Sequence, residues 1–198
     1  SAAEQQLAQL TALAGMPVEA WDIAYWLEKF KQDRFSVSNE ELRAYFPVLT
    51  VKDGLFNLAS QLYGVELVLD DSVTVWHEDV RYYNVLQEGE ALGGFYTDLF
   101  ARNGKRAGAW IDECVTRQQL NGFSARPVGY LVCNFQPPDD RGISLLTHDE
   151  VVTLFHEFGH MLHHLLTRVG FPSVSGINGV PWDAVELPSQ FMENFAWN

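Results

Sequence analysis

The segment His156-Glu157-Phe158-Gly159-His160 brings together the side chains that a zinc hydrolase needs. On a helix, residues four apart lie on the same face, so the two imidazoles can bind one ion. Glu157, between them, is the kind of side chain that takes a proton from a water activated by the metal. The motif therefore predicts zinc ligands at His156 and His160 and a general base at Glu157.

The sequence around this motif predicts one long helix from His148 to about Arg168. Thr147 and Glu150 have the spacing of a capping box, and Arg168 followed by Gly170 is typical of a helix end. The helix is apolar on nearly all sides, as expected of a buried helix. One polar stripe interrupts this pattern, and it comprises Thr153, His156, His160, His163 or His164, and Thr167.

A catalytic zinc site has three protein ligands and one open position, so a third ligand is required. The acidic residues after Arg168 are Asp183, Glu186 and Glu193, and no Lys or Arg follows Arg168 to pair with them. Asp183 and Glu186 share a face if the segment starting at Pro181 is helical. Pro188 is then expected to kink or end that helix.

The motif, Ser175-Gly176 and the run Asp183-Ala184-Val185-Glu186-Leu187-Pro188-Ser189-Gln190 together resemble the thimet-oligopeptidase family of zinc metallopeptidases. Segments 94–102, 105–110 and 133–135 are also similar to that family, so the resemblance covers essentially the whole chain. It implies one zinc ion held by His156, His160 and Glu186, with Glu157 as the catalytic base. It also implies short peptides as substrates.

Alternatives remain for three of these assignments. His163 is a rival third ligand, but it lies about 10 Å along the helix axis from His156, which is awkward for ligands that converge on one ion. Asp183 either orients a ligand imidazole or stabilises a helix start. A non-catalytic helical module, whose histidines pack without metal, is the alternative function.

Members of that family are much longer than 198 residues, and a later segment of theirs contributes Tyr and His donors that stabilise the tetrahedral intermediate. The resemblance therefore maps this chain to a central part of such a peptidase. Loss of one oxyanion donor commonly costs about a hundredfold in rate or more. We therefore expect these 198 residues to carry most of the zinc site and to be a weak catalyst alone.

The composition is that of a globular protein, with 47% hydrophobic and 20% charged residues and no apolar run long enough to span a bilayer. The net charge of −13 disfavours binding to the phosphates of nucleic acids. Cys114 and Cys133 lack metal-type spacing and are expected to be free thiols in a reducing cytoplasm. We therefore expect a cytoplasmic protein without nucleic-acid or membrane partners; its oligomeric state is left open.

The expected fold class is α+β, mainly helical, with a helical segment at 1–64 and, at 65–198, a small sheet that precedes the zinc-binding helices, a zincin-like arrangement. Helices are predicted at 4–13, 21–31, 38–46 and 51–62, and strands at 65–69, 73–76, 81–86, 92–99 and 130–135. The last strand is the candidate edge strand for a substrate backbone, and an interior strand is the alternative. Its residues are Tyr130, Leu131, Val132, Cys133, Asn134 and Phe135.

Overall fold

The computed structural model describes residues 2–35, 39–120 and 122–197, which divide into two compact units, 1–45 and 46–198. The first unit contains helices α1 (Ala2–Ala14), α2 (Ile23–Phe35) and α3 (Asn39–Arg43). The helices expected at 4–13 and 21–31 are confirmed. Ser38, the expected N-cap of the third helix, lies outside the described residues.

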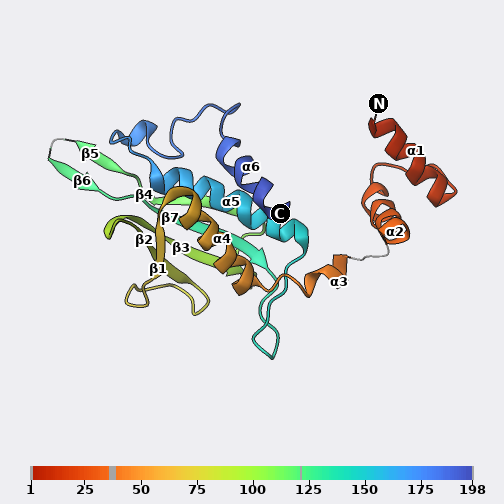
Figure 1. Ribbon diagram of the computed structural model, residues 1–198, viewed down its shortest axis with the longest axis horizontal. Helices are drawn as coiled ribbons and strands as arrows, with labels where there is room; N and C mark the ends of the chain where they lie inside the picture. The colour runs from red at the N-terminus through yellow and green to blue at the C-terminus, as the bar shows by residue number, and fades with distance from the viewer. Residues whose placement is uncertain (1, 36–38, 121, 198) are drawn as a thin grey trace. The chain divides into compact units, whose positions relative to one another are not determined.

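The second unit is a five-stranded sheet with helices on one face (Figure 1). Its strands are β1 (Glu66–Leu69), β2 (Arg81–Gln87), β3 (Glu90–Phe100), β7 (Val128–Phe135) and β4 (Trp110–Val115), in that spatial order. Neighbouring strands are antiparallel except β3 and β7, which are parallel. Strands β5 (Gln118–Leu120) and β6 (Phe123–Ala125) form a separate hairpin. The predicted α+β class is confirmed.

Helix α4 (Val48–Tyr63) belongs to this second unit. It ends at Gly64, whose φ of 65° is the left-handed conformation that glycine adopts at helix ends. Its Leu55 and Phe56 are buried in the same core as the sheet. The boundary between the compact units therefore lies at residue 45, before α4, whereas the sequence suggested a division at residue 64.

Helix α5 (His148–Leu166) packs across β3, β7 and β4 on the same face of the sheet as α4. Phe158 of α5 packs against both Phe56 and Phe95, with ring centroids 5.6 and 5.8 Å away, and those two rings are 5.9 Å apart. Helix α6 (Leu187–Glu193) covers the opposite side of α5 (Figure 1). The metal-motif helix is therefore enclosed on two sides, as its mostly apolar circumference predicted. Every helix among the described residues is too short or too polar to cross a bilayer.

The strand predicted at 73–76 is wrong, because the chain turns there. The Asp70 carboxylate accepts hydrogen bonds from the amide and hydroxyl of Ser72, at 3.0 and 2.5 Å, and from the Asn84 side chain at 2.9 Å. These bonds fix a turn instead of an extended strand. Trp76 then donates to Asp98 and packs against Tyr96, with ring centroids 5.2 Å apart.

Of the two positions considered for Tyr130–Phe135, the structure has the interior one, and the edge position is wrong. This segment is the main part of β7, which is paired with β3 on one side and with β4 on the other. A strand with both edges paired has no free backbone groups for an added strand. The edge strands of the sheet are β1 and β4, and β4 was not anticipated.

The ends of β3 and β7 are joined by a buried charged cluster. Asp98, only 4% exposed, accepts two hydrogen bonds from Arg102, at 2.6 and 2.7 Å, and one from Lys105 at 2.8 Å. Lys105 also donates to the backbone carbonyls of Asp98, Phe100 and Cys133. Burial raises the pKa of Asp98, but these hydrogen bonds and charges outweigh it and lower that pKa to about 2.

We expect Asp98→Asn to lower the free energy of unfolding by about 3–5 kcal/mol, because it leaves Lys105 buried without its anionic partner. A folded-state pKa of about 2 stabilises the wild type by about 2 kcal/mol above pH 4, and this contribution is lost as the pH falls from about 4 to about 2. Urea unfolding between pH 2 and 7 measures both effects. The control is Asp139→Asn, whose ion pair with Arg141 is exposed. Equal losses in the two variants would contradict the prediction.

Candidate metal centre

Helix α5 orients the three polar residues of the motif. Its first turn is closed by the predicted capping box: Glu150 donates its amide to the Thr147 hydroxyl (3.2 Å), and Thr147 donates its amide to the Glu150 carboxylate (2.7 Å). Leu154 and Phe158 are buried against the sheet. Because that face is fixed, His156 and His160 lie on the side of α5 that meets α6.

The two histidines converge on one carboxylate oxygen. The Nε2 atoms of His156 and His160 lie 3.1 and 3.0 Å from Oε2 of Glu186, the residue that immediately precedes α6. One ligand atom from each of the three residues lies within 4.8 Å of the other two. The structure therefore brings together the three residues that the sequence suggested as zinc ligands.

Glu193 fixes the orientation of the first histidine. Its Oε1 lies 2.6 Å from Nδ1 of His156. An ionised carboxylate only accepts hydrogen bonds, so Nδ1 of His156 carries the hydrogen and donates it. In the neutral ring, Nε2 then presents a lone pair toward the Glu186 oxygen. A carboxylate behind a ligand histidine in this way is typical of metal sites.

These three residues fit a zinc ion. Two imidazole nitrogens and a carboxylate oxygen are a usual catalytic donor set. Ligand atoms bonded to one tetrahedral ion at 2.0–2.1 Å lie about 3.3 Å apart, close to the separations of 3.0 and 3.1 Å from Glu186 to the histidines. The lone pair on Nε2 of the neutral His156 ring and the Glu186 oxygen repel each other, and a cation bound between them would remove that repulsion.

The carboxyl groups of Glu157 and Glu186 are in different electrostatic surroundings. Burial raises the pKa of Glu157, an effect that His156 opposes and Glu186 reinforces. The pKa of Glu186 is lowered, chiefly by a hydrogen bond from the Ser189 hydroxyl at 2.8 Å, and also by the two histidines, against the effect of burial. Glu186 is thus held as an anion, whereas Glu157 has a greater affinity for a proton.

Helices α5 and α6 approach closely at Gly159. A Cβ atom at this position would lie 2.5 Å from the carbonyl oxygen of Pro188 and 2.7 Å from Cα of Ser189. Real Cβ atoms essentially never come that close to backbone. The absence of a side chain at Gly159 therefore allows the start of α6, and Glu186 just before it, to reach the histidines.

The segment between α5 and Glu186 is anchored to both α5 and β4. Gly176 lies against the buried ring of His164, where a Cβ would be 2.8 Å from Nδ1. Asn178 donates to the Glu113 carboxylate of β4 at 2.7 Å. The loop that carries the third candidate ligand is thus tied to the edge strand of the sheet.

Two other sequence candidates lie away from this group. Asp183 is exposed in a turn, and among the described contacts it has no hydrogen bond or ion pair with either histidine; Glu193 occupies that position on His156. His163 is not in the cluster of ligand atoms. Burial lowers its pKa, and it lies beside Thr167 and Pro188 at the wall of a pocket.

The segment from Pro181 to Glu186 is a series of turns, so the condition under which Asp183 and Glu186 would share a helix face is not met. Ala184 and Leu187 donate their amides to the carbonyls of Pro181 and Ala184, at 3.0 and 3.1 Å. Pro188 does not end a helix; it lies in the first turn of α6, where its missing N–H costs nothing.

The sequence contained Glu193 as a candidate ligand but gave no reason to pair it with His156. The available signal was the spacing of seven residues between Glu186 and Glu193, which is about two helical turns. Two such residues lie on the same face of a helix, so both can face α5 if that helix packs against it. That signal becomes useful only when the register between α5 and α6 is known.

The sequence model that describes peptidase family M3 matches residues 1–198 of this chain. The chain belongs to peptidase family M3. It is 51% identical to oligopeptidase A of Escherichia coli over 98% of its own length, and 45% identical to the organellar oligopeptidase A of Arabidopsis thaliana over 90%. It is 39% identical to the dipeptidyl carboxypeptidase of Escherichia coli over 98%.

This M3 chain spans only 23–30% of the length of those relatives. The match includes the segment with His156, His160 and Glu186. Family membership is therefore established for these 198 residues. The sequence motifs that carry the family resemblance contain His156, His160 and Glu186, which lie together in the structure.

For the M3 chain we expect about one zinc per molecule by elemental analysis. His160→Ala is expected to abolish zinc binding and Glu186→Ala to weaken it. Glu193→Gln should weaken zinc binding about 10–100-fold. A neutral amide is a weaker acceptor than a carboxylate for the hydrogen on Nδ1 of His156, so the ring is held less firmly. Zinc titration against a chromophoric chelator measures these changes. Glu66→Gln, at an exposed position of β1, is the control and should not change affinity; equal effects of all four substitutions would contradict the ligand set.

We also expect Gly159→Ala to weaken zinc binding at least tenfold and to destabilise the fold by about 1–3 kcal/mol, since its Cβ would push the start of α6 away from α5. The matched control is Gly54→Ala in α4, where no atom lies within 4 Å of the new Cβ and a small stabilisation is expected. Thermal unfolding and the same chelator competition test both variants. Unchanged zinc affinity in Gly159→Ala would refute the importance of this contact.

Proposed function

We propose that this chain carries the zinc site and general base of a metallopeptidase that hydrolyses short peptides. The observation that supports the proposal most strongly is the convergence of His156, His160 and Glu186 beside Glu157. Membership of peptidase family M3 supports the reaction class. Relatives named oligopeptidase A support short peptides as the substrates.

Zinc at this site would polarise the scissile carbonyl and make a water more acidic. Glu157 takes a proton from the attacking water and later delivers it to the departing amine. Its raised pKa suits both steps, because a carboxylate that is too weak a base neither takes nor holds the proton. Glu193 holds His156 in one orientation throughout.

The edge strand β4 is the proposed place for the substrate backbone. Within the part of the chain that the structure describes, β4 is paired with β7 alone, and α5 packs against it. Its free edge presents unpaired N–H and C=O groups, to which an extended peptide adds as another strand. The hydrogen bond between Asn178 and Glu113 connects this strand to the loop that ends at Glu186.

The alternative, a non-catalytic module with packed metal-free histidines, has less support from the geometry. The buried His164 lies outside the cluster: its Nε2 is 3.2 Å from the Val128 carbonyl oxygen, and its Nδ1 has no hydrogen-bond partner among the described residues. His156 and His160 instead face the same carboxylate oxygen. Metal content of the purified chain separates the two functions.

We further propose that these 198 residues alone turn over peptides slowly. The resemblance implies Tyr and His donors to the tetrahedral intermediate from elsewhere in a longer protein, and the loss of one such donor costs about a hundredfold or more. A quenched fluorescent oligopeptide compares the chain with Escherichia coli oligopeptidase A. Equal turnover would disprove this second proposal without affecting the assignment of the zinc site.

Glu157→Gln is expected to bind zinc normally and to lose at least a hundredfold in peptide hydrolysis, because an amide cannot take the proton. Hydrolysis of the fluorescent peptide, measured together with zinc content, tests this expectation. Glu66→Gln on β1 again serves as the control and should retain full activity. If Glu157→Gln kept wild-type activity, the general base would have to be another group.

A further inference from the structure

A cavity separate from the candidate metal centre lies in the second compact unit, residues 46–198. It has a volume of about 380 Å³, within the range of small-molecule sites. Its walls come from the start of α4, from β2 and β3, and from the loop that follows β7; no lining residue belongs to α5 or α6. A ligand here would therefore not contact the proposed zinc ligands.

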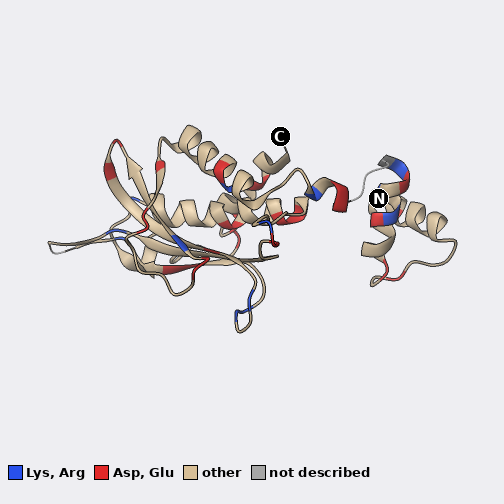
Figure 2. Cartoon of the chain, turned by 90° about the horizontal axis from the view of Figure 1, so that it is seen from below, with Lys and Arg blue, Asp and Glu red and all other residues tan. Residues whose placement is uncertain are grey.

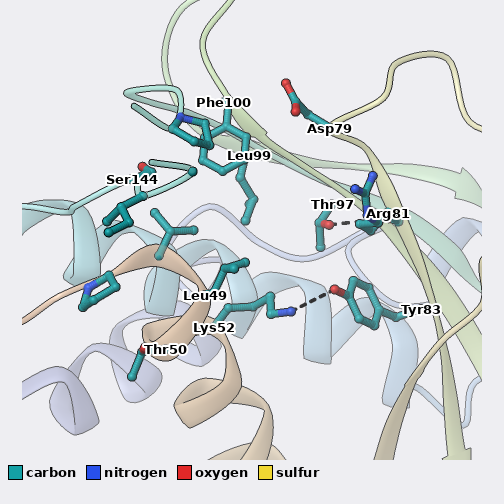
Figure 3. A pocket seen from close by; sticks show the side chains of 15 residues that line it. Leu49, Thr50, Lys52, Asp79, Arg81, Tyr83, Thr97, Leu99, Phe100 and Ser144 are labelled. Atoms are coloured by element: carbon teal, nitrogen blue, oxygen red, sulfur yellow. Dashed lines mark hydrogen bonds between the residues drawn. The ribbon is translucent and has the colours of Figure 1, made fainter. Parts of the chain in front are cut away.

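Most of the cavity wall is apolar. The apolar lining residues are Pro47, Val48, Leu49, Leu99, Phe100, Pro138 and Ile143. Figure 3 shows Leu49, Leu99 and Phe100 on one side of the space, opposite the polar side chains of β2. A ligand that fills this space must have an apolar body.

Lys52 provides a mostly buried positive charge at this cavity. Its side chain is 16% exposed, and Nζ donates to the Tyr83 hydroxyl at 3.0 Å (Figure 3). Nζ also lies 3.2 Å from the carboxylate of Asp53, whose side chain is 67% exposed, and 5.4 Å from the ring centroid of Phe56. An ammonium group has three N–H donors, so one remains for a ligand. Burial lowers the pKa of Lys52, but the interactions with Tyr83 and Asp53 raise it more, which keeps the charge in place.

A second cation and an anion lie farther from the cavity floor. Arg81 donates to the backbone carbonyls of Val80, at 2.8 Å, and of Glu78, and no ion pair of Arg81 occurs among the described residues. Asp79 also lines the cavity, and its carboxylate lies 3.5 Å from Nδ1 of His77. In Figure 3, Asp79 lies on the far side of Arg81 from Lys52. The three charged groups thus follow one another along the cavity in the order Lys52, Arg81, Asp79.

We propose that this cavity binds a small carboxylate with an apolar body, either a free apolar amino acid or the carboxyl end of a short peptide. The carboxylate pairs with Lys52 and faces Arg81. The apolar side chain packs against Leu49, Leu99 and Phe100. Figure 2 shows Asp and Glu on helices and strands alike, consistent with the net charge of −13, whereas this cavity is lined by two cations, Lys52 and Arg81, and by one anion, Asp79.

Three ligands that differ in one group each test the proposal on the full chain. Leucine has both charges, N-acetyl-leucine has only the carboxylate and mimics a peptide end, and leucinamide has only the amino group. Backbone amide shifts in an NMR titration report the place of binding. We expect leucine and N-acetyl-leucine to shift residues 48–52 and 81–83, and leucinamide to bind at least tenfold more weakly. Tighter binding of leucine identifies a free amino acid as the ligand, and tighter binding of N-acetyl-leucine identifies a peptide end.

Two variants remove the site in different ways. Lys52→Met keeps the apolar stem and removes the charge, and it should weaken binding of both carboxylates at least tenfold. Ile143→Trp, at a partly exposed position of the wall, should block the cavity while leaving the charges unchanged. Lys29→Met, on α2, is the matched control for loss of a lysine. Equal binding of leucinamide, unchanged binding in Lys52→Met, or shifts confined to α5 and α6 would overturn the proposal.

Discussion

The close contact between α5 and α6 at Gly159 is the constraint on which the metal centre depends. The histidines are neighbours on one helix, so their spacing is set locally. The third candidate ligand, the Glu186 carboxylate, comes from a residue 26 positions after His160, and it reaches the same point only because the backbone of Pro188 and Ser189 lies directly against Gly159. The apolar packing of α5 on the sheet supplies the rigid surface against which this approach is made.

The same packing gives two glutamates opposite properties. Glu186 lies half-exposed beside the Ser189 hydroxyl and two imidazoles, which lower its pKa and keep it an anion. Glu157 is more enclosed, and burial raises its pKa. Carboxyl groups whose surroundings shift their pKa values in opposite directions are suited to different tasks, here the proposed metal binding by Glu186 and the proposed proton transfer by Glu157. The two side chains have the same chemistry, and only their surroundings differ.

Features that depend on neighbouring residues could be predicted from the sequence, and features that depend on strand order could not. The capping box of Thr147 and Glu150 and the spacing of His156 and His160 are local, and the structure contains both as expected. The interior position of β7 depends on pairing with β4, a strand whose alternation is too weak to recognise. Glu193 became a partner of His156 only through the register of α5 against α6.

X-ray absorption at the zinc edge tests the central claim most directly, because it reports the atoms bound to the metal in solution. For the chain purified with one zinc, the account predicts a first shell of nitrogen and oxygen at about 2.0–2.1 Å, with the outer scattering of two imidazoles. His160→Ala should remove one imidazole contribution or the metal itself. A shell that contains sulfur at about 2.3 Å, or a spectrum without imidazole scattering, would contradict the account.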